Sequence, residues 1–176
     1  MSPKLMLPVT ARDHTRGSPG APVMLVEYGD YECSHCAAAH RIVNEIRDQL
    51  GPNLDFVFRN FPLPAVHPHA IRAAESAEAA GGQRKFWEMH DLLFATQENL
   101  EDMDLLADTQ ILGLDIDQFE YDLFEHRYLP RVQEDFNSGV RSGVNGTPSF
   151  FINGIRHNGR YDRNSLLAAI TAAMNG

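Results

Sequence analysis

With 176 residues, the chain suits one domain or a small core domain with an insertion, and it can bury a core without disulfide staples. Its net charge of −9 repels phosphate backbones and anionic lipids, which argues against nucleic acid as a partner. No stretch approaches the roughly 20 apolar residues of a membrane span, and the N-terminus lacks the apolar run of a secretion signal. We therefore expect a cytoplasmic monomer without a membrane span, or a periplasmic or extracytoplasmic protein if a leader has been removed.

The first third of the chain predicts a surface segment followed by a strand, a helix and a strand. Residues 10–22 are rich in turn formers and indicate a surface lead-in. The apolar segments 23–28 and 54–61 fit buried strands, and between them apolar residues recur at helical spacing before a Gly-Pro stop. Residues 1–61 thus form the first of three predicted parts.

The second predicted part, residues 62–142, is an inserted helical domain. The first expected helix ends at Gly81–Gly82, and the next two occupy 85–94 and 102–112. A fourth helix begins at Asp115, and a fifth ends near Gly143. At the fourth of these, Asp115 and Gln118 resemble a capping box.

The third predicted part, residues 143–176, contains a hairpin and a last helix. In SFFINGIRHN, Asn153–Gly154 suits a two-residue turn with positive φ at both positions, and a helix should start near Asp162. The order βαβ, helices, ββα indicates an α/β fold whose helical domain is inserted after the second strand.

The only two cysteines, Cys33 and Cys36, could form a structural staple, part of a metal site or a redox centre. A bridge between them closes a loop of about four residues and would contribute roughly 2 kcal/mol in the chain-entropy model, so it is a poor staple. Zinc needs four ligands, and the nearest histidines, His67 and His69, lack the usual H-x3–5-H spacing. We therefore expect no metal.

The redox interpretation has a physical mechanism. A thiol at a helix start faces unpaired N–H groups and the positive end of the helix dipole, which lower its pKa to somewhere in ~3.5 to 7.5. Cys33 is then the nucleophile, and Cys36, one turn further, resolves the mixed disulfide. No cofactor is needed, because the dithiol itself carries the electrons.

The strand, the CxxC at a helix start and a later Gly-Thr-Pro before a ββα ending resemble the thioredoxin fold. The inserted helices and the dipeptide Ser34–His35 resemble its DsbA branch. Bacterial single-domain DsbA-like proteins, some of them fused to sodium/proton antiporters, are similar along nearly the whole chain. The similarity is carried in this sequence by the motifs APVMLVEYGDYECSHC, FRNFPL with His67–Pro68, KFWEMHD and GVNGTPSFFING. The departure is Ser34, where many relatives carry Pro. The resemblance implies a protein-disulfide oxidoreductase that acts on protein or peptide thiols and disulfides, together with an unknown redox partner.

The same resemblance implies roles for residues around the cysteines. Glu27 matches a buried acid that relays protons to the inner cysteine, and His35 matches a residue that stabilises the Cys33 thiolate. Thr147–Pro148 aligns with the cis-proline loop that receives an extended peptide. The expected substrate-binding residues are Ser34, Gly146, Thr147 and Pro148.

Plainer interpretations stand beside these roles. Glu27 could be a solvated strand residue, His35 a solvent-facing histidine and Pro148 an ordinary trans proline. Asp30 and Glu32 are interpreted as surface charges. His90, within a helix, is expected to be a packed or capping residue.

Three other function classes remain open. The first is a peptide-binding or chaperone-like module with incidental cysteines, and the second is a zinc protein. The third is a glutathione-dependent transferase or isomerase, which a complete CxxC argues against. The direction of electron flow also stays open, because a low thiol pKa favours disulfide donation whereas a cytoplasmic location favours reduction.

Overall fold

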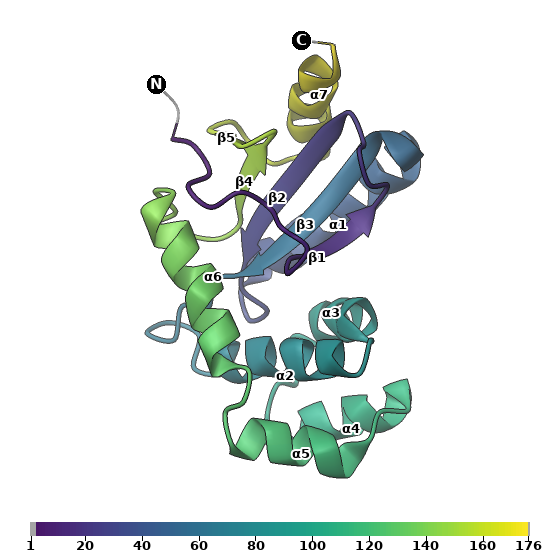
Figure 1. Cartoon of the computed structure of the whole chain (residues 1–176), viewed down its shortest axis with the longest axis vertical. Helices are drawn as coiled ribbons and strands as arrows, with labels where there is room; N and C mark the ends of the chain where they lie inside the picture. The colour runs from purple at the N-terminus through teal and green to yellow at the C-terminus, as the bar shows by residue number, and fades with distance from the viewer. Residues whose placement is uncertain (1–2, 176) are drawn as a thin grey trace.

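The computed structural model describes residues 3–175 and shows a five-stranded sheet with helices on both faces and a helical block beyond one end (Figure 1). The strands are β1 (His14–Gly17), β2 (Val23–Gly29), β3 (Leu54–Asn60), β4 (Ser149–Ile152) and β5 (Ile155–Arg156). The helices are α1 (Ser34–Leu50), α2 (Ala70–Gly82), α3 (Phe86–Ala95), α4 (Asp102–Leu112), α5 (Ile116–Phe124), α6 (Leu129–Arg141) and α7 (Arg163–Met174).

The strand order across the sheet is β1-β3-β2-β4-β5. Among the strand pairs within residues 3–175, only β2–β3 is parallel, and α1 supplies the crossover that parallel neighbours require. Helices α2 to α6 lie in the chain between β3 and β4, within the segment 62–142 that the sequence predicted to be helical. The predicted α/β fold with an inserted helical region is confirmed.

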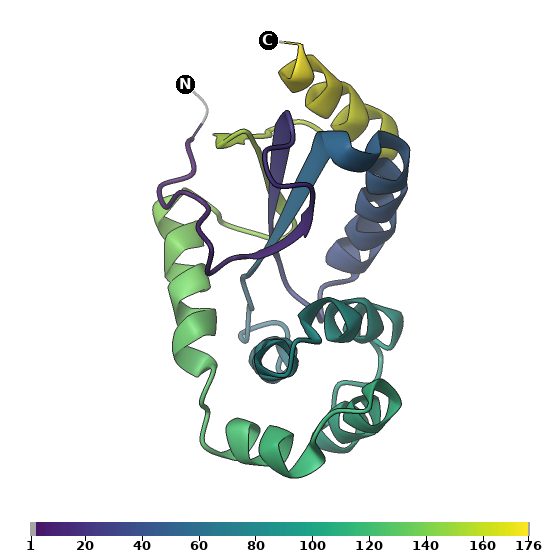
Figure 2. The same ribbon diagram turned by 45° about the vertical axis from the view of Figure 1, so that its right-hand side comes forward.

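The two faces of the sheet have separate cores. Helices α1 and α7 lie on one face, and α6 with the N-terminal segment lies on the other (Figure 2). Along β2 the side chains alternate, so that Leu25 joins the α1 face whereas Val26 and Tyr28 join the α6 face. Each fully buried side chain of this kind contributes about 1.5 to 3 kcal/mol.

The lead-in prediction for residues 10–22 is wrong in part, because His14–Gly17 forms β1. This strand pairs antiparallel with β3, and the His14 ring stacks on Phe86 at 3.5 Å between centroids. Its sequence HTRG has no apolar alternation, so only the distant partner strand stabilises it as a strand.

The hairpin turn agrees with its prediction, whereas the start of α5 agrees only in part. Asn153 and Gly154 have φ angles of 47° and 78°, as the hairpin prediction required. At the start of α5, Asp115 Oδ1 accepts from Gln118 N at 3.0 Å, but the Gln118 side chain donates to Asp122. The predicted capping box is therefore only half formed.

Candidate active site

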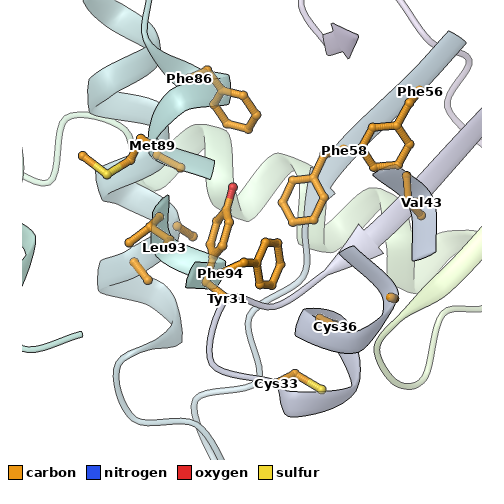
Figure 3. Packing of buried hydrophobic residues seen from close by; sticks show 14 of the residues in the cluster. Tyr31, Cys33, Cys36, Val43, Phe56, Phe58, Phe86, Met89, Leu93 and Phe94 are labelled. Carbon is orange, nitrogen blue, oxygen red and sulfur yellow. The ribbon is translucent and has the colours of Figure 1, made fainter. Parts of the chain in front are cut away.

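The two cysteines begin α1 and differ in their access to solvent. Cys33 is the N-cap residue, and its carbonyl oxygen accepts from Cys36 N at 3.0 Å. Both are free thiols, Cys33 with 6% of its surface exposed and Cys36 with none. They lie at the border of the hydrophobic cluster that holds Tyr31 and Phe58 (Figure 3). Cys33 is therefore the thiol that a substrate can reach.

The surroundings of Cys33 favour its thiolate. The hydrogen bond from the Cys36 thiol contributes most to lowering the pKa of Cys33 to about 5, against the opposing effect of burial. Thr147 and the backbone N–H groups of Cys36 and His35 lower it further. The Cys33 thiol also lies 3.6 Å from the Thr147 carbonyl oxygen, to which its protonated form can donate.

The surroundings of Cys36 favour the neutral thiol. Burial raises its pKa, and the nearby charges of Glu27 and Cys33 act in the same direction. A weak contact opposes them, because the Asp30 backbone N–H points at Cys36 Sγ from 3.5 Å. Cys36 therefore needs a proton acceptor before it can attack a mixed disulfide.

Glu27 is a buried carboxylic acid on the α1 face of the sheet. It lies on β2 between Phe58 and Phe150, with 1% of its surface exposed. Burial, followed by the negative charge of Cys33, raises its pKa to about 8. Within residues 3–175, Oε1 of Glu27 has no hydrogen-bond partner. The interpretation as a solvated strand residue is thus wrong, and the acid can change protonation near neutral pH.

His35 and Ser34 occupy the exposed positions between the cysteines. The His35 Nδ1 atom lies 2.9 Å from the Tyr161 hydroxyl, whereas its backbone N–H acts on Cys33. Tyr161 comes from the loop before α7, and the sequence analysis missed it because no local pattern marks this residue. The predicted action of the imidazole itself on the Cys33 thiolate stays a prediction.

The loop before β4 completes the site. The Thr147–Pro148 peptide bond is cis, and Gly146, Thr147 and Pro148 are all half-buried. Ser149 Oγ donates to the Gly146 carbonyl at 2.7 Å and closes the loop. The structure therefore brings Thr147, with its chain neighbours Gly146 and Pro148, beside Cys33.

A family model described as thioredoxin matches residues 10–172. The chain belongs to the thioredoxin family. Among solved structures, a thioredoxin-like oxidoreductase from Silicibacter pomeroyi DSS-3 is 26% identical, with a TM-score of 0.84 and 95% of both chains covered. BdbD from Bacillus subtilis, in its oxidised form, is 20% identical with a TM-score of 0.84, over 99% of this chain and 98% of that one.

The inserted helices make this thioredoxin DsbA-like. Wolbachia pipientis alpha-DsbA1 has the same fold, with a TM-score of 0.82 and 23% identity over 97% of this chain and 94% of that one. By sequence, the chain is 49% identical over 98% of its length to a Na(+)/H(+) antiporter NhaA 1 from Salinispora arenicola. It spans about a quarter of the length of the curated relatives that it matches, 26% in that case. In residues 3–175, no helix combines the length and apolar character needed to cross a bilayer.

Two acids before the CxxC tie the thioredoxin half to the helical block. Asp30, with 1% of its surface exposed, accepts from Leu63 N at 2.9 Å and pairs with His67 Nδ1 at 2.8 Å. Glu32 pairs with His69 Nδ1 at 2.9 Å and also accepts a hydrogen bond from the backbone N–H of His69. The interpretation as a surface charge is wrong for Asp30, which the segment leading into α2 covers, whereas the Glu32 side chain keeps 19% of its surface exposed.

The helical block also reaches the active-site loop from α3 and from the turn after it. Gln97 Nε2 donates to the carbonyl oxygens of Tyr31 and Cys33 at 2.8 and 2.9 Å. The predicted packing of His90 is confirmed, since it is 1% exposed and its Nδ1 lies 3.0 Å from the Tyr31 hydroxyl. Burial lowers the pKa of His90 well below its ordinary value and keeps the ring neutral.

Proposed function

We propose that this DsbA-like thioredoxin is a protein thiol–disulfide oxidoreductase, which exchanges its Cys33–Cys36 pair with protein or peptide substrates through a mixed disulfide. The observation that carries the proposal is the contrast between the two thiols. The accessible Cys33 has a pKa lowered to about 5, and the buried Cys36 has a pKa that is raised. One thiol is thus built to react with a substrate and the other to resolve the intermediate.

In the oxidising direction, a substrate thiolate attacks Cys33 Sγ, a mixed disulfide forms, and Cys36 leaves as a thiolate that takes up a proton from Glu27. A second substrate thiolate then attacks the substrate sulfur and releases the Cys33 thiolate. The substrate loses two electrons and the cysteine pair gains them. In the reducing direction the Cys33 thiolate attacks first, and Glu27 removes the proton from Cys36.

The low pKa of Cys33 bears on the direction of exchange. It stabilises the reduced form and makes Cys33 a good leaving group, so it raises the reduction potential and favours disulfide donation. In the cytoplasm, the compartment expected from the sequence unless a leader has been removed, the glutathione and thioredoxin pools would hold the pair as a dithiol that reduces substrates. The compartment therefore sets the net direction, and no cofactor takes part in either.

The test is to equilibrate the protein with a series of glutathione ratios and to assay exchange with a disulfide-containing protein. Cys33→Ser should abolish exchange, and Cys36→Ala should accumulate mixed disulfides because nothing resolves them. Full activity in Cys33→Ser would refute the mechanism. If the double change to Ser at Cys33 and Cys36 left partner binding and phenotype intact, the protein would instead be a binding module with incidental cysteines.

A further inference from the structure

A shallow groove runs away from the CxxC along the loop before β4. One hollow of about 340 Å³ lies between His35 and Pro148, and a second of about 230 Å³ continues from Pro148 to His157. Pro148, Ser149, Arg156 and Tyr161 line both hollows. The two therefore form one continuous groove that begins beside the reactive cysteine.

This groove carries a positive charge, that of Arg156, in a chain whose net charge is −9. Arg156 and the histidines His35 and His157 line it, and no carboxylate does so among the lining residues that the structure describes. The next carboxylate along the chain, Asp162, is held by Arg160 Nε at 2.9 Å and caps α7 through Ser165. The groove thus presents the positive charge of Arg156, without a lining carboxylate among the described residues, to whatever enters it.

Arg156 is the fixed charge of the groove. Its Nη2 atom donates to Asn145 Oδ1 at 3.1 Å and to Ser149 Oγ at 3.5 Å, and its Nη1 atom donates to the Gly143 carbonyl. These acceptors are all neutral. Within residues 3–175 no carboxylate pairs with Arg156, whereas Arg163 pairs with Glu45 at 3.3 Å. The guanidinium is therefore oriented by neutral groups and keeps its charge available.

Tyr161 and Pro148 give the groove apolar walls. The Tyr161 hydroxyl is 2.9 Å from His35 Nδ1, so the tyrosine bridges the start of α1 and the loop before α7. Its ring centroid lies 6.4 Å from that of Phe150 beneath. An aliphatic stem of a substrate residue can pack on such walls while its charged end reaches Arg156.

We propose that this groove is a subsite for an acidic side chain, Asp or Glu, close in sequence to the reacting cysteine of a peptide substrate, with Arg156 as the specificity-determining residue. The inference rests on the proposed function, which places the substrate cysteine on Cys33. Because Cys33 Sγ lies 3.6 Å from the Thr147 carbonyl, a bound peptide passes along residues 146–149 and directs a neighbouring side chain into the groove.

The test uses peptides that carry one cysteine and differ only at its two neighbouring positions, which hold Glu, Gln or Lys. The rate constant for exchange with the Cys33–Cys36 disulfide should be about tenfold higher for Glu than for Gln, as expected for one charge-assisted hydrogen bond, and lowest for Lys. Arg156→Gln should bring the Glu-to-Gln ratio to about 1, and Arg156→Lys, which keeps the charge but loses the fixed orientation of the guanidinium, should retain only part of the preference.

The ratio is measured within each variant, so a loss of folded protein cancels. Arg141→Gln is the matched control, since Arg141 is an exposed arginine that donates to the Asn137 carbonyl and lies outside the groove. Its ratio should equal that of the wild type. Equal rates for the Glu, Gln and Lys peptides in the wild type would overturn the subsite, while the exchange itself would still support the proposed function.

If no peptide exchanges, the proposed function fails, and the subsite is then tested by binding alone. The same peptides with Ser in place of Cys are titrated by calorimetry into the wild type and Arg156→Gln. Tighter binding of the Glu peptide that disappears in Arg156→Gln would support the acidic subsite. Equal affinities would overturn it.

Discussion

The two faces of the central sheet each bury an ionisable group, but the surroundings of the two groups act in opposite ways on the charged form. On the α1 face, the Glu27 carboxyl has an oxygen without a hydrogen-bond partner within residues 3–175. On the α6 face, Arg59 is 3% exposed and donates to Asp13 at 2.7 Å and to the Tyr28 hydroxyl at 3.0 Å. Glu27 and Tyr28 are neighbours in sequence, so one step along β2 separates the two environments.

The difference shows that depth of burial alone does not produce a titrating group. Burial raises the pKa of Glu27 to about 8, because nothing compensates its charge. Burial acts against the charge of Arg59 as well, but the hydrogen bonds to Asp13 and Tyr28 outweigh it and raise the pKa of the guanidinium. One face therefore stores a proton that can move, and the other holds a permanent ion pair.

The largest effect is expected from breaking the ion pair. Asp13→Ala should lower the free energy of unfolding by about 3 to 5 kcal/mol, because it leaves the buried Arg59 charge without its carboxylate. Urea denaturation measures the change. The matched control is Glu134→Ala, whose partner Arg12 is 69% exposed and whose pair should be worth at most about 1 kcal/mol. Arg59 also donates to the Leu7 and Pro8 carbonyl oxygens at 3.0 and 3.2 Å, and equal losses in both variants would show that these carbonyls suffice for it.

Replacing Glu27 should instead raise the free energy of unfolding at neutral pH. In the folded protein its pKa is about 8 instead of the ordinary 4.5, so between these values the folded state keeps a proton that the unfolded state has lost. The contribution of Glu27 to stability therefore falls as pH rises through this window, and at neutral pH the burial of Glu27 costs about 3 kcal/mol. Glu27→Gln should remove that slope.

The measurement is urea denaturation of the reduced wild type and variant at several pH values across the window. The slope is taken from the difference between the two proteins, because the lowered pKa of Cys33 contributes a slope of opposite sign to both. Glu27→Gln should also slow release of the mixed disulfide, because no acid then takes the proton from Cys36. Parallel stability profiles for the variant and the wild type would show that Glu27 does not hold a proton in the folded state.

Cys33 and Cys36, which lie on the same face of the sheet as Glu27, should lose their protons at different pH values. Alkylation of Cys33 by iodoacetamide should rise through a midpoint near pH 5 and then level off, and Cys36 should stay unmodified. Since the folded pKa of Cys33 is depressed, its thiolate stabilises the reduced protein above that midpoint and the contribution is lost as pH falls through it. In Cys36→Ala the midpoint should move toward the ~8.5 of a free cysteine. An unchanged midpoint would mean that the Cys36 hydrogen bond is not the main cause.

The smallest effect is expected from the exposed end of the site. His35→Ala should move the Cys33 midpoint by less than about one unit, because the backbone N–H that acts on Cys33 remains and an exposed charge is screened. The same alkylation profile measures it. A larger shift would show that the imidazole itself stabilises the thiolate, as the resemblance to DsbA-like proteins implies.

Local patterns in the sequence predicted much of this molecule. Apolar periodicity and turn residues gave the α/β order, the helical insertion and the hairpin at Asn153–Gly154. The CxxC at a helix start marked the reactive centre without reference to its surroundings. These features depend on neighbours only a few residues away, which is why a sequence reveals them.

What the sequence did not show depends on contacts between distant segments. Strand β1 exists because β3 pairs with it, and Asp30 is buried because the segment near His67 covers it. Gln97 reaches Cys33 across 64 positions, and Tyr161 reaches His35 across 126. No local pattern distinguishes such residues from ordinary surface residues, so three-dimensional packing alone reveals their place in the site.

The contact between Cys33 and the Thr147 carbonyl also has a consequence for protein synthesis. The two residues are 114 positions apart, and the helices α2 to α6 lie between them in the chain. A ribosome therefore releases the cysteine pair long before the loop that lies against it. A growing chain therefore carries Cys33 without the Thr147 contact until the last strands join the sheet.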